Sequence, residues 1–171
     1  NRLVILGGGE SGVGAAYLAF RNGIDVFLSE KKIIKSKHKE ILVQNNIDFE
    51  EGFHSADLIL QAKEVIKSPG IPNNVDIIKE IDKRKIPVIS EIELAFRFTN
   101  AKIIAVTGSN GKTTTTCLIY EILKFANLNV GVAGNIGNSF SFLVASKNFD
   151  YIVLEISSFQ CAQVHSRTSQ L

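Results

Sequence analysis

The amino-acid sequence predicts an α/β protein with parallel sheets, and three observations indicate this class. Short apolar runs typical of buried strands alternate with segments in which apolar residues recur at helical spacing. A glycine-rich stretch follows an apolar run in each half of the chain, at residues 7–12 and 107–112. The composition, 45% hydrophobic and 21% charged over 171 residues, is that of an ordinary globular protein. We therefore expect right-handed crossovers, with ligands bound beyond the carboxyl ends of the strands.

The first elements of the chain read as strand, glycine turn, helix and strand. Residues 3–6 (LVIL) are predicted as a buried strand, and the glycine stretch leads into a helix that ends near Gly23. Residues 25–30 (DVFLSE) form the next expected strand. The lysine-rich residues 31–46 have apolar side chains on one side, as in a surface helix. We interpret the lysines as solvated, because no aromatic residues interleave with them.

Three further elements complete this first layer. Residues 64–72 (EVIKSPGIP) contain a strand that enters a Ser-Pro-Gly turn. A helix is expected over residues 75–85, and a strand at residues 87–91 (PVISE). Together these elements predict a first domain at residues 1–91.

A second unit is expected after that point, as a partial domain at residues 92–171. Its strand KIIAV precedes the second glycine stretch, and strands and helices again alternate beyond it. The apolar patterning of residues 161–171 is weak, and their structure is left open. The helices and strands of this half are predicted at residues 91–100, 102–106, 112–126, 128–134, 135–146 and 150–158.

Charge and composition argue against several classes of function. The formal net charge is +2, which gives no general reason to expect nucleic acid or an anionic membrane as partner. Cys117 and Cys161 stand in no metal-ligand spacing, and a reducing cytoplasm with two free thiols is the simpler interpretation. No apolar run reaches the roughly 20 residues of a membrane helix, and no signal peptide is evident. We expect a cytoplasmic protein, and a chain without Met that opens on Asn1 suggests a fragment of a longer product.

The first glycine loop has the spacing of a dinucleotide-binding turn. Gly7, Gly9 and Gly12 satisfy G-x-G-x-x-G between a strand and a helix, and Glu30 lies at the end of the second strand. Glycines permit close approach of a diphosphate to the helix N-terminus, and the acid can accept a hydrogen bond from a ribose or base. This predicts a Rossmann-like domain that binds a nucleotide-type ligand. NAD and FAD are two examples of such a ligand. The alternative is a glycine turn that merely packs.

The second glycine loop contains the parts of a phosphate cradle at an unusual spacing. The P-loop pattern places a glycine where this chain has Val106, yet Gly108 and Gly111 still permit the turn. Lys112 can neutralise the β- and γ-phosphates, and the hydroxyl of Thr113 can hold Mg²⁺. We expect a P-loop-type ATPase domain. The alternative is a strand-to-helix turn that contains Gly-Lys-Thr by chance.

Three other sets of polar residues are candidates for a metal or substrate site. Glu155 ends the apolar strand YIVLE and is expected to be a second metal ligand, because P-loop proteins present an acid beside the loop. Asn135 suits either hydrogen bonding to a substrate or a turn. The histidines His38, His54 and His165 are scattered, and we interpret them as surface or satisfied residues rather than a metal set.

Six motifs in this order resemble the Mur ligases. They are G-x-G-x-S-G at residues 7–12, SPGI at 68–71, SEIEL at 90–94, TGSNGKTT at 107–114, GNIG at 134–137 and LEISSFQ at 154–160. The short loop G-x-x-G-K-[ST] is the normal form in that family. SPGI, GNIG and LEISSFQ favour the member that adds D-glutamate.

The resemblance implies an ATP-dependent enzyme of peptidoglycan synthesis that joins D-glutamate to UDP-N-acetylmuramoyl-L-alanine through an acyl phosphate, with Mg²⁺. Lys112 and Glu155 would be catalytic, and Thr113 and Glu155 would hold the metal. The implied ATP-binding residues are Gly108, Ser109, Asn110, Gly111, Lys112, Thr113 and Thr114. The implied substrate-binding residues are Glu10, Ser11, Gly12, Glu30, Ser68, Pro69, Gly70, Asn135, Ser157 and Gln160.

The family's second metal site and its D-glutamate contacts would lie beyond Leu171. We therefore expect a monomer that is inactive as residues 1–171 alone. Two alternatives remain open, another Mur-type ligase and an NAD-binding module. The second alternative leaves the TGSNGKTT loop unexplained.

Overall fold

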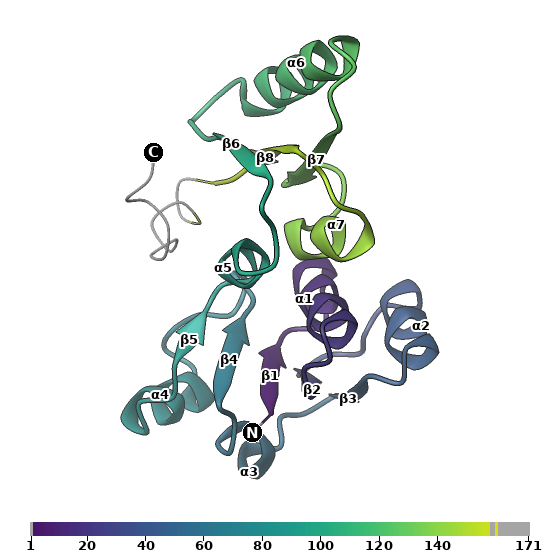
Figure 1. The fold of residues 1–171 in the computed structure, drawn as a ribbon. Helices are drawn as coiled ribbons and strands as arrows, with labels where there is room; N and C mark the ends of the chain where they lie inside the picture. Colours follow the sequence, from purple (N-terminus) through teal and green to yellow (C-terminus); the bar gives the residue numbers. More distant parts are fainter. Residues whose placement is uncertain (1, 158–159, 161–171) are drawn as a thin grey trace.

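The computed structural model describes residues 2–157 and residue 160, which form two parallel sheets with helices on both faces (Figure 1). The first sheet contains β1 (Leu3–Leu6), β2 (Val26–Glu30), β3 (Asp48–Glu51), β4 (Glu64–Lys67) and β5 (Val88–Ile89). Its strand order is β3-β2-β1-β4-β5, and all neighbours are parallel. The order reverses at β1, between β2 and β4, and ligands of doubly wound sheets bind at such a point.

Alternate residues of β1 supply two separate cores. Leu3 and Ile5 pack in one core with side chains of α1, α2 and α5, whereas Val4 and Leu6 pack in the other with side chains of α3 and α4. Successive strand residues point to opposite faces, so a run of four apolar residues suits a strand covered on both sides. The helices are α1 (Glu10–Arg21), α2 (Ser36–Gln44), α3 (Ala56–Ile59), α4 (Asp76–Lys83) and α5 (Glu91–Phe96).

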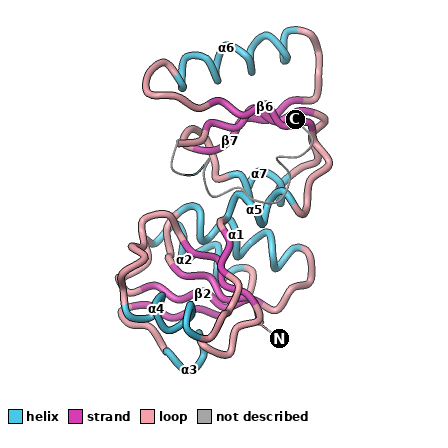
Figure 2. Tube along the Cα trace, turned by 90° about the vertical axis from the view of Figure 1, so that its left-hand side faces the viewer, coloured by secondary structure: helices cyan, strands magenta, loops and turns pink. Residues whose placement is uncertain are grey.

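The second sheet has the order β6-β8-β7, again with parallel neighbours. Its strands are β6 (Lys102–Val106), β7 (Val130–Gly134) and β8 (Tyr151–Glu155). Helix α6 (Lys112–Phe125) covers one face and α7 (Phe140–Ser146) the other (Figure 2). The predicted α/β class with parallel sheets is confirmed. Within the described residues each strand and helix expected from the sequence is present, β1 and β6 at the predicted bounds and the others at shifted bounds.

Two elements were not predicted, β3 and α3. Strand β3 has the sequence DFEE, and its three acidic residues hide the apolar signal of a strand. Charged side chains are typical of an edge strand, which is where β3 lies. Helix α3 spans four residues, too few for a helical repeat to be visible.

Helix α7 joins the two sheets. A Cβ atom on Gly14 of α1 would lie 2.1 Å from Oγ of Ser139, so the absent side chain lets α7 approach α1 closely. Tyr17 and Phe142 stack across this contact with ring centroids 5.2 Å apart. The core that contains α1 and α5 continues through Phe140 into the second sheet. The two sheets therefore share one hydrophobic core.

A buried carboxyl group lies in the same joint. The Oε1 atom of Glu91, the first residue of α5, accepts a hydrogen bond from the backbone N–H of Ser141, and Oγ of Ser141 donates to the Glu91 carbonyl at 3.1 Å. Burial raises the pKa of Glu91 to about 7, with a further contribution from the charge of Glu10, although the hydrogen bonds from Ser141 oppose the shift.

Among the described residues, no helix is long and apolar enough to cross a membrane.

Candidate functional site

The first glycine loop is shaped by two close contacts, one with a side chain and one with the backbone. Gly7 has a φ of +110°, and a Cβ atom there would lie 2.4 Å from Oγ of Ser68. A Cβ atom on Gly12 would lie 1.9 Å from the carbonyl oxygen of Gly7, so α1 can begin directly over the end of β1 only without a side chain. Gly9, the N-cap of α1, has no atom within 4 Å of a Cβ position. Two of the three motif glycines are therefore sterically required.

The carboxylate of Glu30 holds this loop in place. Its Oε2 accepts a hydrogen bond from the backbone N–H of Gly8 at 2.6 Å, and its Oε1 accepts one from Lys32 at 2.8 Å. The sequence predicted that this acid would face a ribose or base. The structure places it at the cavity, but each carboxylate oxygen already has a backbone donor.

The Ser-Pro-Gly turn lies beside the loop, at the end of β4. The N–H of Ser68 donates to the carbonyl of Leu6 at 3.0 Å, and the N–H of Ile71 donates to the carbonyl of Ser68 at 3.1 Å. Lys67 Nζ donates to the Ile71 carbonyl at 2.7 Å, and burial lowers the pKa of Lys67. These bonds close the turn and tie it to β1.

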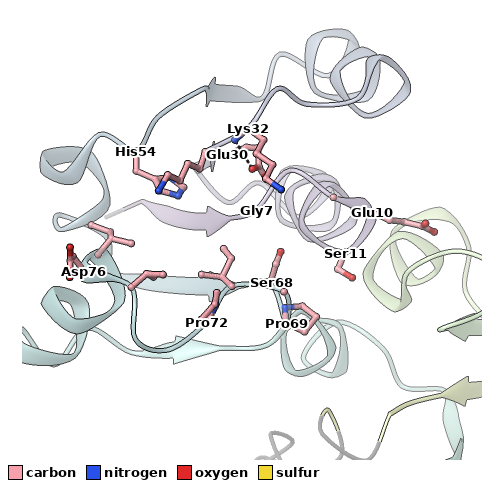
Figure 3. Close-up of a pocket in the computed structure, with 16 residues that line it drawn as sticks. Gly7, Glu10, Ser11, Glu30, Lys32, His54, Ser68, Pro69, Pro72 and Asp76 are labelled. Carbon is pink, nitrogen blue, oxygen red and sulfur yellow. Dashed lines mark hydrogen bonds between the residues drawn. The ribbon is translucent and has the colours of Figure 1, made fainter.

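Loop and turn line a single cavity of about 690 Å³ (Figure 3). A cavity of this size is in the range of small-molecule and cofactor sites. Six of the sequence-predicted substrate residues line it together, namely Glu10, Ser11, Glu30, Ser68, Pro69 and Gly70. Gly12 does not line the cavity and supports the loop from beneath, against Gly7.

The cavity also contains residues that sequence reasoning missed. Lys31, Lys32, His54 and Asp76 are among its lining residues. The two lysines belong to the segment that the sequence predicts as solvated surface. His54 follows β3. Because the sequence does not predict β3, it also does not predict that His54 lies near the end of a strand.

The two described histidines, His38 and His54, each have a hydrogen-bond contact through Nδ1. His38 is buried with Nδ1 at 3.2 Å from the Gly8 carbonyl, and His54 has Nδ1 at 2.6 Å from Oγ of Ser29. His165 lies outside the described residues. Residues 2–157 and 160 contain no group of three or more His, Cys, Asp or Glu residues placed to hold a metal.

The second glycine loop follows β6 and is exposed. Gly108 has a φ of +142°, and Gly111, the N-cap of α6, has a φ of +72°. Both values favour glycine, which explains why these two positions suffice to make the turn without an outer glycine at Val106. Lys112 folds back over the loop, where its Nζ donates to the carbonyl of Gly108 at 2.8 Å and to that of Ser109 at 3.5 Å.

Glu155 lies beside this loop at the end of the central strand β8. It pairs in register with Val106 of β6 on one side and with Gly134 of β7 on the other. Gly134 has a φ of +109°, and a Cβ atom there would lie 2.0 Å from the Glu155 carbonyl oxygen. The Glu155 side chain is buried, and its Oε2 has no hydrogen-bond partner among the described residues.

The unpartnered oxygen fits a divalent cation. A buried carboxylate oxygen without a donor is costly, and a cation removes that cost. Mg²⁺ prefers oxygen ligands, which Glu155 and the hydroxyl of Thr113 would supply. Oγ1 of Thr116 on α6 is a second buried oxygen without a hydrogen-bond partner among the described residues.

Three sequence-predicted substrate residues lie away from the first cavity. The N–H of Asn135 donates to the Glu155 carbonyl at 3.0 Å, which places this exposed residue at the carboxyl edge of the second sheet. Ser157 and Gln160 pair with each other, since Oγ and N of Ser157 both lie 3.0 Å from Oε1 of Gln160. The structure thus divides the predicted residues between two strand-end sites.

The family models and the curated relatives that match this chain all describe Mur ligases. The MurD N-terminal domain matches residues 2–77, and the Mur ligase middle domain matches residues 106–171. A UDP-N-acetylmuramoylalanine–D-glutamate ligase of Bacteroides thetaiotaomicron is 54% identical over 165 residues, covering 96% of this chain and 37% of the relative. The ligase of that name from Bacillus velezensis is 41% identical over 167 residues, covering 95% of this chain and 37% of the relative.

Solved structures share the fold. The UDP-N-acetylmuramate:L-alanyl-γ-D-glutamyl-meso-diaminopimelate ligase of Neisseria meningitides matches with a TM-score of 0.63 at 22% identity, covering 92% of this chain and 54% of that chain. A pseudomurein peptide ligase type C from Methanothermus fervidus matches with a TM-score of 0.55 at 28% identity, covering 92% and 33%. The present chain spans 37% of the length of the two curated relatives described above. Since the two family models together match both halves of the chain and the curated relatives align with nearly all of it, the chain belongs to the Mur ligase family.

Proposed function

We propose that this chain forms the nucleotide-substrate and ATP-binding parts of a ligase that adds D-glutamate to UDP-N-acetylmuramoyl-L-alanine. The observation that carries the proposal is the presence of two different glycine loops at the carboxyl ends of two parallel sheets. One opens onto a cavity of about 690 Å³, and the other follows Val106, whose register partner Glu155 has a buried carboxylate oxygen without a hydrogen-bond partner among the described residues. Relatives named for this reaction at up to 54% identity support the choice of amino acid.

The reaction requires activation of a carboxylate. A carboxylate is a poor acylating agent, because its oxygen is a poor leaving group. Transfer of the γ-phosphoryl group of ATP to the alanyl carboxylate gives an acyl phosphate, which the amine of D-glutamate attacks. The phosphate then leaves as the amide forms, so that ATP hydrolysis drives the reaction.

We assign the phosphoryl-transfer roles to the second loop. Lys112 would release the Gly108 and Ser109 carbonyls and donate to the phosphate oxygens, stabilising the charge of the transfer. The backbone N–H groups of residues 108–114 would cradle the phosphates at the start of α6. Thr113 and Glu155 would hold Mg²⁺, which when bound neutralises charge on the phosphate oxygens.

We assign the UDP part of the substrate to the first cavity. Ser11 and the amides of the first loop would contact the diphosphate, and Ser68 and Gly70 would face the sugar side. Asn135 at the second sheet would meet the substrate where it crosses toward ATP. D-glutamate would bind outside these residues, and we expect a cytoplasmic monomer with the domain division at residue 91.

The test is phosphate release by the full-length protein with ATP and UDP-N-acetylmuramoyl-L-alanine. Release should depend on D-glutamate, be lost in Lys112→Ala and persist in Lys124→Ala, a control at the exposed end of the same helix. Stimulation by L-alanine or a diamino acid in place of D-glutamate would overturn the amino-acid assignment and leave the ligase class. Turnover by residues 1–171 alone would overturn the assigned roles.

A further inference from the structure

The wall of the first cavity contains a hydrogen-bond chain that the proposed substrate contacts do not use. Strands β2 and β3 pair with Ser29 opposite Glu50, so these two side chains lie on one face of the sheet. Ser29 is fully buried, and its Oγ donates to Oε1 of Glu50 at 2.6 Å. The same Oγ lies 2.6 Å from Nδ1 of His54, which lines the cavity.

Proton accounting along this chain fixes the state of the imidazole. Although burial opposes ionisation, the hydrogen bonds from Ser29 and Ser55 keep the pKa of Glu50 below its usual value, so that its carboxylate only accepts. Ser29 therefore donates its single hydroxyl proton to Glu50. The contact between Ser29 and His54 then requires a proton on Nδ1 of His54. Nε2 carries the lone pair of the neutral ring.

The neutral ring is also favoured by its surroundings. Burial lowers the pKa of His54, and the charge of Lys31 lowers it further, whereas the charges of Glu50 and Glu30 act in the opposite direction. The net shift is downward. Near neutral pH, Nε2 of His54 is thus a hydrogen-bond acceptor.

The position of His54 in the cavity indicates which part of a bound nucleotide would donate a hydrogen bond to its Nε2. Figure 3 shows it at the end of the cavity opposite Glu10 and Ser11, which flank the glycine loop. A nucleotide with its diphosphate at the loop would extend its nucleoside toward that end. Glu30, the acid expected to serve the nucleoside, already accepts hydrogen bonds from the N–H groups of Gly8 and Lys32.

We propose that Nε2 of His54 accepts a hydrogen bond from the uridine moiety of the bound substrate, either from N3–H of the base or from a ribose hydroxyl. Ser29 and Glu50 are positioning residues that select the required tautomer. The inference rests on the proposed function, because it takes the first cavity to be a UDP site.

Calorimetric titration of the full-length protein with UDP tests the contact. His54→Phe keeps a ring but removes the acceptor, and should weaken UDP binding about tenfold, the effect of one lost hydrogen bond. Asp57→Asn on the adjacent helix α3, outside the cavity lining, should leave the affinity unchanged. Equal affinity of wild type and His54→Phe overturns the inference alone. Failure of the wild type to bind UDP overturns the proposed use of the cavity as well.

Substrate analogues identify the donor. N3-methyl-UDP, 2′-deoxy-UDP and 3′-deoxy-UDP each remove one candidate donor. One of them should bind the wild type about tenfold more weakly than UDP, and bind His54→Phe as well as UDP does, as expected when both changes remove the same bond. If every analogue loses the same affinity in both proteins, the contact does not exist.

Nuclear magnetic resonance of the wild-type protein tests the contact without a variant, and one variant then tests the positioning role of Ser29. The ¹⁵N resonances of His54 should show a protonated Nδ1 and an unprotonated Nε2 in the free protein. Addition of UDP should shift the Nε2 resonance, and Ser29→Ala should allow the other tautomer. A protonated Nε2 in the free protein, or no shift on adding UDP, would refute the proposed role.

Discussion

The two glycine loops solve the problem of anion binding in different ways. Around the first loop, two carboxylates have donors before any ligand arrives, since Glu30 accepts a hydrogen bond from Gly8 and Glu50 accepts one from Ser29. Around the second loop, Oε2 of Glu155 and Oγ1 of Thr116 are buried without hydrogen-bond partners among the described residues. The first site is therefore organised by its own side chains, whereas the second leaves two buried oxygen atoms without partners among the described residues, one of which belongs to the proposed Mg²⁺ ligand Glu155.

The same contrast extends to the surrounding core. Both faces of the first sheet are covered by helices that contribute buried apolar residues to two cores. On α6 of the second sheet, Leu118, Ile122 and Phe125 expose 59%, 57% and 91% of their surface. Side chains at this spacing share one side of a helix. Folding stability and ligand chemistry should thus respond differently to mutation in the two regions.

Glu155→Gln should have the largest effect, and it should separate activity from stability. Loss of the charged ligand should lower ligase activity by about 10²- to 10³-fold, as when a key electrostatic group is removed. The free energy of unfolding in the absence of Mg²⁺ should rise, because Oε2 is buried without a hydrogen-bond partner among the described residues and an amide is less costly to bury than a carboxylate. Phosphate release and thermal unfolding measure the two quantities. A fall in both would indicate that Glu155 is structural.

Gly12→Ala tests the tight packing of the first loop. A Cβ atom 1.9 Å from the Gly7 carbonyl must displace backbone, so the variant should lose about 3 kcal/mol of unfolding free energy and bind UDP weakly. Gly9→Ala is the matched control, since nothing lies within 4 Å of its Cβ position. Thermal unfolding and UDP titration of the pair are the measurements. Equal behaviour would mean that the loop is not rigid.

Glu91 links the two regions and predicts a pH dependence. Its pKa is raised from 4.5 in the unfolded chain to about 7 in the folded protein, so the folded state binds the proton more tightly. The resulting stabilisation is present below pH 4.5 and is lost as the pH rises to 7, by about 3 kcal/mol at most. Glu91→Gln should remove this component and should be more stable than the wild type at pH 8. Denaturant unfolding at pH 5 and pH 8 checks the difference, and parallel pH profiles of the two proteins would contradict it.

The smallest effect is expected for the surface ion pair between Arg97 and Glu64. Their contacts at 2.8 and 3.0 Å connect α5 to β4 within the first region, and the Arg97 side chain is partly exposed. Arg97→Ala should cost less than about 1 kcal/mol of unfolding free energy, because exposed pairs are screened by solvent. UDP affinity should not change. A larger loss measured by denaturant unfolding would show that α5 depends on this pair.

The sequence predicted the order of the strands and helices well, because strands buried on both faces, such as LVIL and YIVLE, produce clear apolar runs. It also predicted that two glycine loops would follow strands, and Gly7 and Gly111 in these loops have positive φ. It missed β3 because the strand lies at an edge and is acidic. As a result it missed His54, whose place depends on that strand.

Other features depend on contacts between distant residues and leave no local pattern. The hydrogen bond from Gly8 to Glu30 joins residues 22 positions apart, and the contact of Ser141 with Glu91 spans 50 positions. The pKa of Glu91 follows from such packing and not from its neighbours in the chain. The assigned roles of Lys112, Thr113 and Glu155 stay predictions until activity is measured.

Lys112 folds back onto the carbonyls of its own loop. A nucleotide that binds at the second loop would therefore have to replace these contacts. The ammonium group already has two carbonyl acceptors, so a phosphate gains only the difference between its own attraction and theirs. Single anions such as inorganic phosphate should compete poorly for this lysine. In the proposed ATP site, a triphosphate that also engaged the loop amides and Mg²⁺ would displace the carbonyls, so the loop would select for polyvalent ligands before any specificity for the base is exercised.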